Sequence, residues 1–340
     1  MASIAPGSVK LFGEHAVIYD RVGVSASLDR HATVTILPEE HDRVEVFLPD
    51  LGFSRALREE EIDAERRTLD FIFSKNDMRG LRELRRGNFA LPFAYILGSV
   101  FMQAGFRPMK IEVRSQVPRY SGLGSSSSIF TALASELSEH FGLKLGVQGI
   151  ADLANLGDKV VHGSPSGIDV NTCAHGGFLR FRKGEGLKKA DVKGFVHVIV
   201  ANTNVKKDTG EMIARVADRF AKDRSGADDI FDDMQEAAFA GLDALKAGDL
   251  VKLGAEFDRT QACFERLGLN TKETDEIIRA ARKHGAYGAK ISGAGGGCCV
   301  IALAKEPPKL LPLFEQMGYP SFVAELGVAG VRHGKFDQVV

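Results

Sequence analysis

The sequence predicts an α+β protein, because two hydrophobic periodicities alternate along it. Apolar residues recur at every second position in 31–37 and 110–117, as in strands with one buried face. They recur every three or four residues in 129–137 and 147–161, as in amphipathic helices. The chain has 340 residues, which is enough for two cores.

A polar, glycine-containing stretch at 182–193 divides the chain. The dense apolar segment 195–201 then predicts a strand that opens a second half. We therefore expect one domain at 1–189 and another at 190–340.

The first half is expected to begin with β structure. Short apolar pieces at 3–15, 22–28 and 31–37 predict hairpin-like strands. The charge-dense region 39–87 predicts solvated helical faces, and 88–105 predicts a buried core helix.

Later elements follow from turn-forming residues and apolar runs. The segment 162–169 predicts a loop and 177–181 a strand. For the second half we expect, in order, two or three helices, a glycine loop at 293–297, a buried strand ending near 303, a helix at 310–318 and a strand within 322–331.

Composition excludes several classes of function. Hydrophobic residues make up 44% and charged residues 26%, and the net charge of −1 argues against bulk electrostatic binding to nucleic acid or an anionic membrane. The four cysteines form no C-x-x-C pair, which favours reduced thiols over a zinc site. The chain opens without a signal-peptide pattern, so we expect a cytoplasmic protein.

The segment 118–128, PRYSGLGSSSS, lies between a predicted strand and a predicted helix. Gly122 and Gly124 can take left-handed backbone angles and let a ligand approach the main chain. The unpaired N–H groups of the first helical turn favour an anion there. The serines at 125–128 add hydroxyls for phosphate or magnesium. A capped helix after a tight turn explains the same pattern, and the segment alone does not decide.

Two further glycine-containing loops lie near Gly7 and Gly13 and at 293–297. None of the three loops contains G-x-x-x-x-G-K-[ST] or completes G-x-G-x-x-G, and the protein-kinase motifs are absent. A phosphate site of another type is therefore expected.

In their order along the chain, these loops resemble the three motifs of the galacto-, homoserine, mevalonate and phosphomevalonate (GHMP) kinase superfamily. The matching segments are APG…LFGEHAV at 5–17, P…GLGSS at 118–126 and KISGAGGG at 290–297. The resemblance runs from residue 5 to about residue 303 and is patchy between 39 and 87. Within the superfamily the chain is most similar to mevalonate kinases, through 13–17, 162–169, 202–209 and 267–270.

This resemblance implies a fold and a reaction. The amino-terminal domain would resemble domain 2 of ribosomal protein S5, and the carboxy-terminal domain would be ferredoxin-like. ATP and mevalonate would bind in the cleft between them, and with Mg²⁺ the γ-phosphoryl group would pass directly to mevalonate, giving 5-phosphomevalonate and ADP.

The resemblance also implies residue roles. Asp169 would be the catalytic carboxylate, although a turn aspartate after Gly167 is the plain alternative. Ser126 and Asp158 would bind magnesium; the family usually has glutamate at the position of Asp158. The residues expected at mevalonate are Glu14, His15, His162 and Thr203. Those expected at ATP are Gly122, Leu123, Gly124, Ser125, Ser126, Ser127, Ser128, Gly293, Ala294, Gly295 and Gly296. Cys298 stands where the family usually has a further glycine.

The chain departs from the family at Ser8, where a lysine assisting the catalytic carboxylate is usual. Lys10 is the nearby basic residue. Because residues two apart on a strand point to the same face, Lys10 can project toward the same site. An ordinary surface lysine is the equal alternative.

Two rival functions are left open. Another kinase of the superfamily would accept phosphomevalonate, a sugar or an amino-acid alcohol; Arg119, Lys206 and Lys207 suit a phosphorylated acceptor. A non-catalytic nucleotide sensor draws support only from the absence of lysine at position 8. The expected partners are small molecules, with neither nucleic acid nor membrane, and a homodimer is left open.

Overall fold

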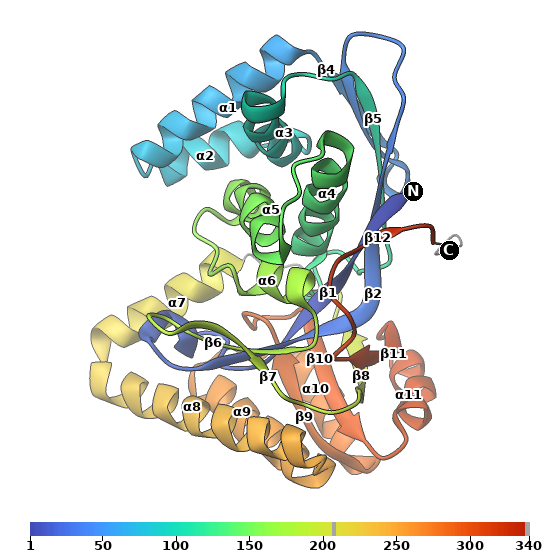
Figure 1. Cartoon of the computed structure of the whole chain (residues 1–340). Coiled ribbons are helices and arrows are strands. Elements are labelled where there is room, and N and C mark those ends of the chain that lie inside the picture. The colour runs from blue at the N-terminus through green and yellow to red at the C-terminus, as the bar shows by residue number, and fades with distance from the viewer. Residues whose placement is uncertain (206–208, 337–340) are drawn as a thin grey trace.

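A computed structural model describes residues 1–205 and 209–336, and Figure 1 shows its arrangement. Over these residues the strands form one twelve-stranded sheet with helices packed against it. β3 pairs with β5 in parallel and the other ladders are antiparallel, so the sheet is mixed and the α+β prediction is confirmed.

The strands are β1 (Ala2–Phe12), β2 (Gly23–Leu37), β3 (Val44–Leu48), β4 (Phe53–Leu57), β5 (Met109–Ser115), β6 (Phe178–Arg182), β7 (Gly186–Ala190), β8 (Val196–Asn202), β9 (Ala286–Ser292), β10 (Cys299–Ala304), β11 (Ser321–Leu326) and β12 (Arg332–Gly334). The α-helices are α1 (Glu59–Ser74), α2 (Met78–Arg85), α3 (Leu91–Ala104), α4 (Ser125–Phe141), α5 (Val147–His162), α6 (Ile168–His175), α7 (Thr209–Lys222), α8 (Arg224–Ala247), α9 (Leu250–Arg266), α10 (Lys272–Lys283) and α11 (Leu311–Gln316). Short 3₁₀ turns lie at η1 (Ala16–Tyr19), η2 (Pro49–Leu51) and η3 (Pro307–Leu310).

The expected β structure at the amino terminus is confirmed, and its first two strands pair antiparallel as in a hairpin; it is more continuous than predicted, because 22–28 and 31–37 lie in one strand. β1 and β2 are two long strands that pair with each other, and bulges interrupt their register at Pro6/Gly7 and Lys10/Phe12. Most of β1 is buried, so its sequence lacks a clean alternation that would reveal a single strand. The bulges absorb proline and glycine without ending the strand.

The region 39–87 is only partly the helical segment expected. α1 and α2 are present, but a hairpin of β3 and β4 precedes them. Each strand has only five residues, which is too short for a firm periodicity, and Val44 and Val46 become recognisable as core residues only in the fold. The core helix expected at 88–105 is confirmed as α3.

Two other expectations need correction. The segment 162–169 is not wholly a loop, because α6 begins at Ile168 after Gly167 (φ 76°), so that Asp169 lies in a first helical turn. The second half has four helices, α7 to α10, between β8 and β9 rather than two or three. For 162–169 the reason is that a tight turn and the start of a short helix both favour glycine and small residues, so the local sequence does not distinguish them.

The carboxy-terminal strands lie in the order β11-β8-β10-β9, all antiparallel, with helices between β8 and β9 and between β10 and β11. This is the βαββαβ arrangement of a ferredoxin-like fold. The Cα pair Leu326–Leu28 joins this part of the sheet to β2. The boundary at 189/190 falls at the end of β7 and stays a prediction.

Each half has a hydrophobic cluster of its own, and a further cluster, with Phe12 of β1 and Phe257 of α9, spans both halves. α3, α4 and α5 pack on β2, β3 and β5, with Ile96 and Leu133 at the contact. α8, α9 and α10 pack near β8, β9 and β10, with Phe231 and Phe264 fully buried. Between residues 1 and 205 and between 209 and 336, no helix combines the length and apolar character needed to cross a membrane.

Candidate active site

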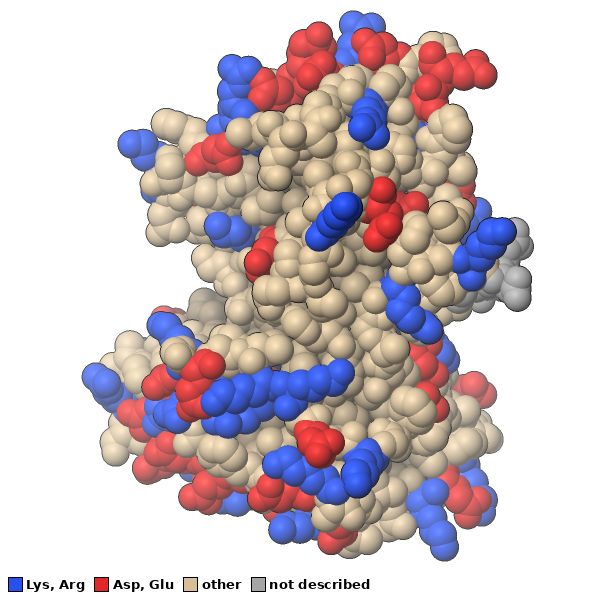
Figure 2. All heavy atoms as spheres, viewed as in Figure 1, with Lys and Arg blue, Asp and Glu red and all other residues tan. Residues whose placement is uncertain are grey.

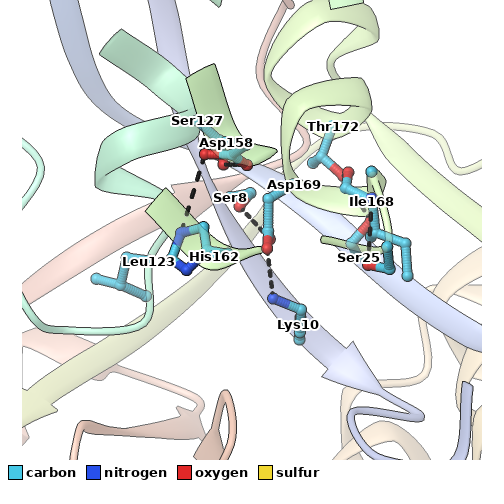
Figure 3. A network of polar contacts seen from close by, with 12 residues as sticks. Ser8, Lys10, Ser25, Leu123, Ser127, Asp158, His162, Ile168, Asp169 and Thr172 are labelled. Carbon is cyan, nitrogen blue, oxygen red and sulfur yellow. Dashed lines mark hydrogen bonds and ion pairs between the residues drawn. The ribbon is translucent and has the colours of Figure 1, made fainter. Parts of the chain in front are cut away.

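Asp169 lies between two side chains of β1. Ser8 Oγ donates to its Oδ1 at 2.7 Å, and Lys10 Nζ donates to its Oδ2 at 2.6 Å. Figure 3 shows the three side chains together, with α6 carrying Asp169 toward β1. Ser8 and Lys10 therefore do project from one face of the strand, and Lys10 is not an ordinary surface lysine.

The protonation states of this pair follow from burial and charge. Burial opposes ionisation of Asp169, but the charge of Lys10 and the hydrogen bonds from Lys10 and Ser8 outweigh it, so the Asp169 pKa is lowered. Burial likewise opposes the Lys10 charge, but the attraction of Asp169 prevails and raises the Lys10 pKa. Both groups are charged near neutral pH.

A second carboxylate, Asp158 on α5, faces the start of α4. It accepts hydrogen bonds from Ser126 Oγ at 3.0 Å and Ser127 Oγ at 2.6 Å. His162 Nε2 lies 3.2 Å from Ser126 Oγ and 3.9 Å from Asp158 Oδ1. Asp158 is 2% exposed, and its pKa is raised, first by burial.

These residues fit a magnesium ion. Ser126 and Asp158 supply hard oxygen donors, and a buried carboxylate with a raised pKa is one that a cation would stabilise. Among residues 1–205 and 209–336, no cluster of three or more His, Cys, Asp or Glu side chains could hold a metal alone. Magnesium commonly takes one or two carboxylates and completes its shell with water and substrate phosphate.

The loop before α4 has the predicted backbone. Gly122 and Gly124 take φ of 73° and 68°, and the first i→i+4 bond of the helix runs from Ser128 N to Gly124 O at 2.8 Å. The N–H groups at the start of α4, before Ser128, therefore make no i→i+4 bond within the helix and are positioned for an anion. The side chains of Ser127 and Ser128 are buried. Ser127 Oγ donates to Asp158 and Ser128 Oγ donates to the Ser125 carbonyl, whereas the sequence suggested that all four hydroxyls serve phosphate or magnesium.

The glycine loop 293–297 of the second half faces the loop before α4. A Cβ built on Gly122 would lie 3.8 Å from Gly293 Cα and 3.8 Å from Cys298 Cβ. Cys298 takes φ of 66°, so it retains the left-handed backbone that glycine favours. Thr203 is 5% exposed, and its hydroxyl donates to the Cys298 carbonyl at 2.8 Å, so it supports this loop.

Glu14 and His15 are buried beneath the same glycine loop. His15 Nε2 lies 2.9 Å from the Ala294 carbonyl, and burial lowers the His15 pKa. Glu14 Oε1 accepts from Lys290 Nζ, whereas Glu14 Oε2 has no hydrogen-bond partner among the described residues. A cavity of about 10 Å³, with Lys10 among its lining residues, adjoins Glu14.

Sequence reasoning gave no role to Ser8 or Lys290. Ser8 was noted only as a missing lysine, yet its hydroxyl binds Asp169. Lys290 is part of the third motif, but a lysine beside glycines carries no sign that it will be fully buried. Lys206 and Lys207, considered for a phosphorylated acceptor, lie outside the described residues, and Arg119 stacks on Tyr120 with its guanidinium carbon 5.0 Å from the ring centroid.

Family models match both halves of the chain. The GHMP kinases N terminal domain matches residues 92–177, and the GHMP kinases C terminal domain matches 242–318. A mevalonate kinase of Pyrococcus furiosus is 30% identical over 312 residues, covering 88% of each chain. The chain belongs to the GHMP kinase family. The resemblance stated from the three motifs is thereby confirmed.

Other similar proteins carry the same name. A mevalonate kinase of Aeropyrum pernix is 28% identical over 338 residues, covering 98% of each chain. The crystal structure of Methanococcus jannaschii mevalonate kinase superposes on this GHMP kinase with a TM-score of 0.79, at 25% identity, covering 96% of this chain and 98% of that one. The mevalonate kinase of L. major, solved with R-mevalonate, shares the fold at 20% identity and a TM-score of 0.76, covering 97% of each chain.

Proposed function

We propose that this chain is a mevalonate kinase, which transfers the γ-phosphoryl group of ATP to a hydroxyl of mevalonate to give 5-phosphomevalonate and ADP. The observation that carries the proposal is the contact of Asp169 with both Ser8 and Lys10, beside a loop suited to phosphate. The relatives that match nearly the whole chain bear this name.

In the proposed reaction, the mevalonate hydroxyl oxygen attacks the γ-phosphorus, and the bond to the β–γ bridging oxygen breaks to release ADP. Asp169 is ionised, accepts a hydrogen bond from the hydroxyl and takes its proton, which then passes to solvent. Lys10 stays protonated, holds the carboxylate and stabilises charge on the transferred group.

The phosphates are held from both halves of the chain. The N–H groups at the start of α4 and the glycine loop 293–297 bind them, and Ser126 and Asp158 would hold magnesium. A bound magnesium ion neutralises part of the phosphate charge.

The acceptor pocket is proposed from the remaining side chains. Glu14 Oε2 is a buried acceptor with no hydrogen-bond donor among residues 1–205 and 209–336, which suits a substrate hydroxyl. The His162 side chain is 45% exposed and adjoins Ser126, so it is available to the acceptor. His15 and Thr203 contribute by holding the glycine loop at Ala294 and Cys298.

A substrate panel tests the proposal. Purified protein with MgATP is given mevalonate, phosphomevalonate, galactose or homoserine, and ADP release and phosphorylated product are measured. We expect turnover with mevalonate and a loss of about 10²–10⁴-fold in kcat for Asp169→Asn. Turnover only with another acceptor identifies a different GHMP kinase. No turnover with any acceptor supports the alternative of a non-catalytic nucleotide sensor. The ion pair of Lys10 and Asp169 argues against that alternative. A cytoplasmic location is part of the proposal, and sedimentation of the protein decides whether it is a homodimer.

A further inference from the structure

Lys290 is a buried charge that the reaction described above does not use. Its side chain is fully buried in β9, and its ammonium donates to Glu14 Oε1, to the Ile291 carbonyl at 2.6 Å and to the Lys10 carbonyl at 3.4 Å. An ammonium has three donors, so all of them are used. Burying a charge is costly even when it is paired, and an apolar side chain would fill a strand position at lower cost.

The contact with Lys10 falls where β1 is irregular. The register of β1 against β2 shifts between Lys10 and Phe12, and a bulge leaves backbone groups without their regular strand partners. At this point Ser292 Oγ also donates to the Lys10 carbonyl, at 3.3 Å. Two donors from β9 therefore fix the backbone of the residue whose ammonium lies 2.6 Å from Asp169 Oδ2.

β9 leads directly into the glycine loop 293–297, so these contacts join that loop to β1. A second link lies beside the first, because His15 Nε2 contacts the Ala294 carbonyl, and His15 follows Glu14 in the chain. Polar contacts thus join the glycine loop and β9 to Lys10 and Glu14.

We propose that Lys290 is a positioning residue for phosphoryl transfer, which couples the placement of the glycine loop to the alignment of Lys10 with Asp169. The inference rests on the proposed function, since its effect is a change in kcat. Catalysis is sensitive to such alignment, because a displacement of about 1 Å can cost about a hundredfold in rate.

A double-mutant cycle tests this role. Lys290→Met keeps the length of the stem and removes the ammonium, and we expect kcat to fall about 30- to 100-fold with less than a threefold change in the KM for ATP. If Lys290 acts through Lys10, adding Lys290→Met to the Lys10→Met variant should lower the kcat of that variant by less than about threefold. Equal losses in both backgrounds would overturn the proposal, as would a parental kcat for Lys290→Met.

A second variant covers the case in which Lys290→Met does not fold. Ser292→Ala removes the other donor to the Lys10 carbonyl without leaving a charge unpaired, and about a two- to fivefold loss of kcat is expected, absent in Lys10→Met. Parental kcat for Ser292→Ala, or equal losses in both backgrounds, counts against the proposal.

Arg21→Met is the matched control. Arg21 joins the turn after η1 to Asp228 and Asp232 on α8, at 3.0 Å each, and touches no residue of the candidate site. It should lower stability and leave kcat unchanged. The parental enzyme separates the two hypotheses: no mevalonate turnover by the parent refutes the proposed function, whereas an active parent with multiplicative losses refutes only the role of Lys290.

Discussion

At the scale of single residues, the lysine that contacts Asp169, the proposed catalytic carboxylate, lies two positions further along the chain than the resemblance to the family implies. Ser8 stands where the family has lysine, but Lys10 reaches Asp169 from two residues further along β1. Strand geometry allows this shift of the lysine, since alternate side chains share a face. The bulge after Lys10 and the contacts from β9 then fix the backbone that carries it.

Lys10→Met should lower kcat about a hundredfold or more with a smaller change in the KM for ATP. The stem that packs in the site is retained, but a preorganised donor to developing charge is lost, which typically costs about 2.7–4 kcal/mol. Steady-state kinetics with mevalonate and MgATP provide the measurement. Ser8→Ala, which removes a neutral donor to the same carboxylate, should cost less. A parental rate for Lys10→Met would mean that this enzyme works without the charge.

Lys10 also sets how stability depends on pH. The folded pKa of Asp169 is lowered below its ordinary value of 3.8, so the group stabilises the protein above that value and loses this effect as pH falls through the folded pKa. Lys10→Met removes the charge and the hydrogen bond that favour ionised Asp169, and burial then outweighs the hydrogen bond from Ser8. The folded pKa of Asp169 should therefore lie above 3.8, and the contribution of Asp169 to stability should fall as pH rises.

Urea denaturation in EDTA measures this change. From about pH 7 to about pH 4.5, the free energy of unfolding of Lys10→Met should rise relative to that of the parent. A difference between the two proteins that stays constant over this range would show that Lys10 does not control the Asp169 charge.

At the scale of elements, α4 has a left-handed glycine at each end, with different surroundings. Gly124 (φ 68°) precedes the helix and lies against Ser8, whereas Gly142 (φ 66°) ends it in open space. A Cβ at Gly124 would lie 2.2 Å from Ser8 Oγ and 3.0 Å from Ser8 N, and one at Gly142 would meet nothing within 4 Å. The backbone requirement is thus shared, and only the first glycine adjoins the candidate site.

Gly124→Ala should weaken MgATP binding at least about tenfold, or about 1.4 kcal/mol, because the phosphate loop must move away from β1. Gly142→Ala is the matched control: it carries a similar left-handed strain of about 1 kcal/mol and should leave the affinity unchanged. Titration calorimetry gives the affinities and thermal unfolding the stabilities. Equal effects of the two substitutions on MgATP affinity would show that the loop at Gly122 and Gly124 has only a structural role.

At the scale of the whole molecule, the two halves share one sheet and one site. β11 meets β2 at the pair Leu326–Leu28, and the buried pair of Glu14 and Lys290 crosses between β9 and the turn after β1. The outline of the molecule narrows between its upper and lower parts in Figure 2, yet β1 and β2 run through both. The two cores are therefore connected by main-chain pairing as well as by side chains.

This connection predicts that both halves unfold in one cooperative transition. Calorimetry of the ligand-free protein should give a calorimetric enthalpy close to the van't Hoff enthalpy, and far- and near-ultraviolet circular dichroism should give coincident curves. Saturating MgATP and mevalonate should raise the single Tm, since ligands at about 100 times their Kd add about 2.7 kcal/mol. Two resolved transitions would show that the halves are independent domains.

The sequence by itself determined the class of fold, the long helices and the order of the three glycine loops. The sequences of α3, α4 and α5 each contain a periodicity or a run of apolar residues that indicates a helix. These patterns depend on neighbouring residues and not on distant parts of the chain. Glycines at left-handed positions, such as Gly122 and Gly124, are likewise local requirements of the backbone. The β3–β4 hairpin and α6 were too short for such signals.

Only the tertiary structure decided which side chains meet at the site. Lys10 and Asp169 are 159 residues apart, and Glu14 and Lys290 are 276 apart. Whether a lysine is a solvated surface residue or a fully buried partner depends on how distant elements pack around it, because burial makes an unpaired charge costly and a paired one tolerable. The same packing buried the hydroxyl of Ser127 against Asp158 and left Glu14 Oε2 without a donor in the part of the chain that the structure describes.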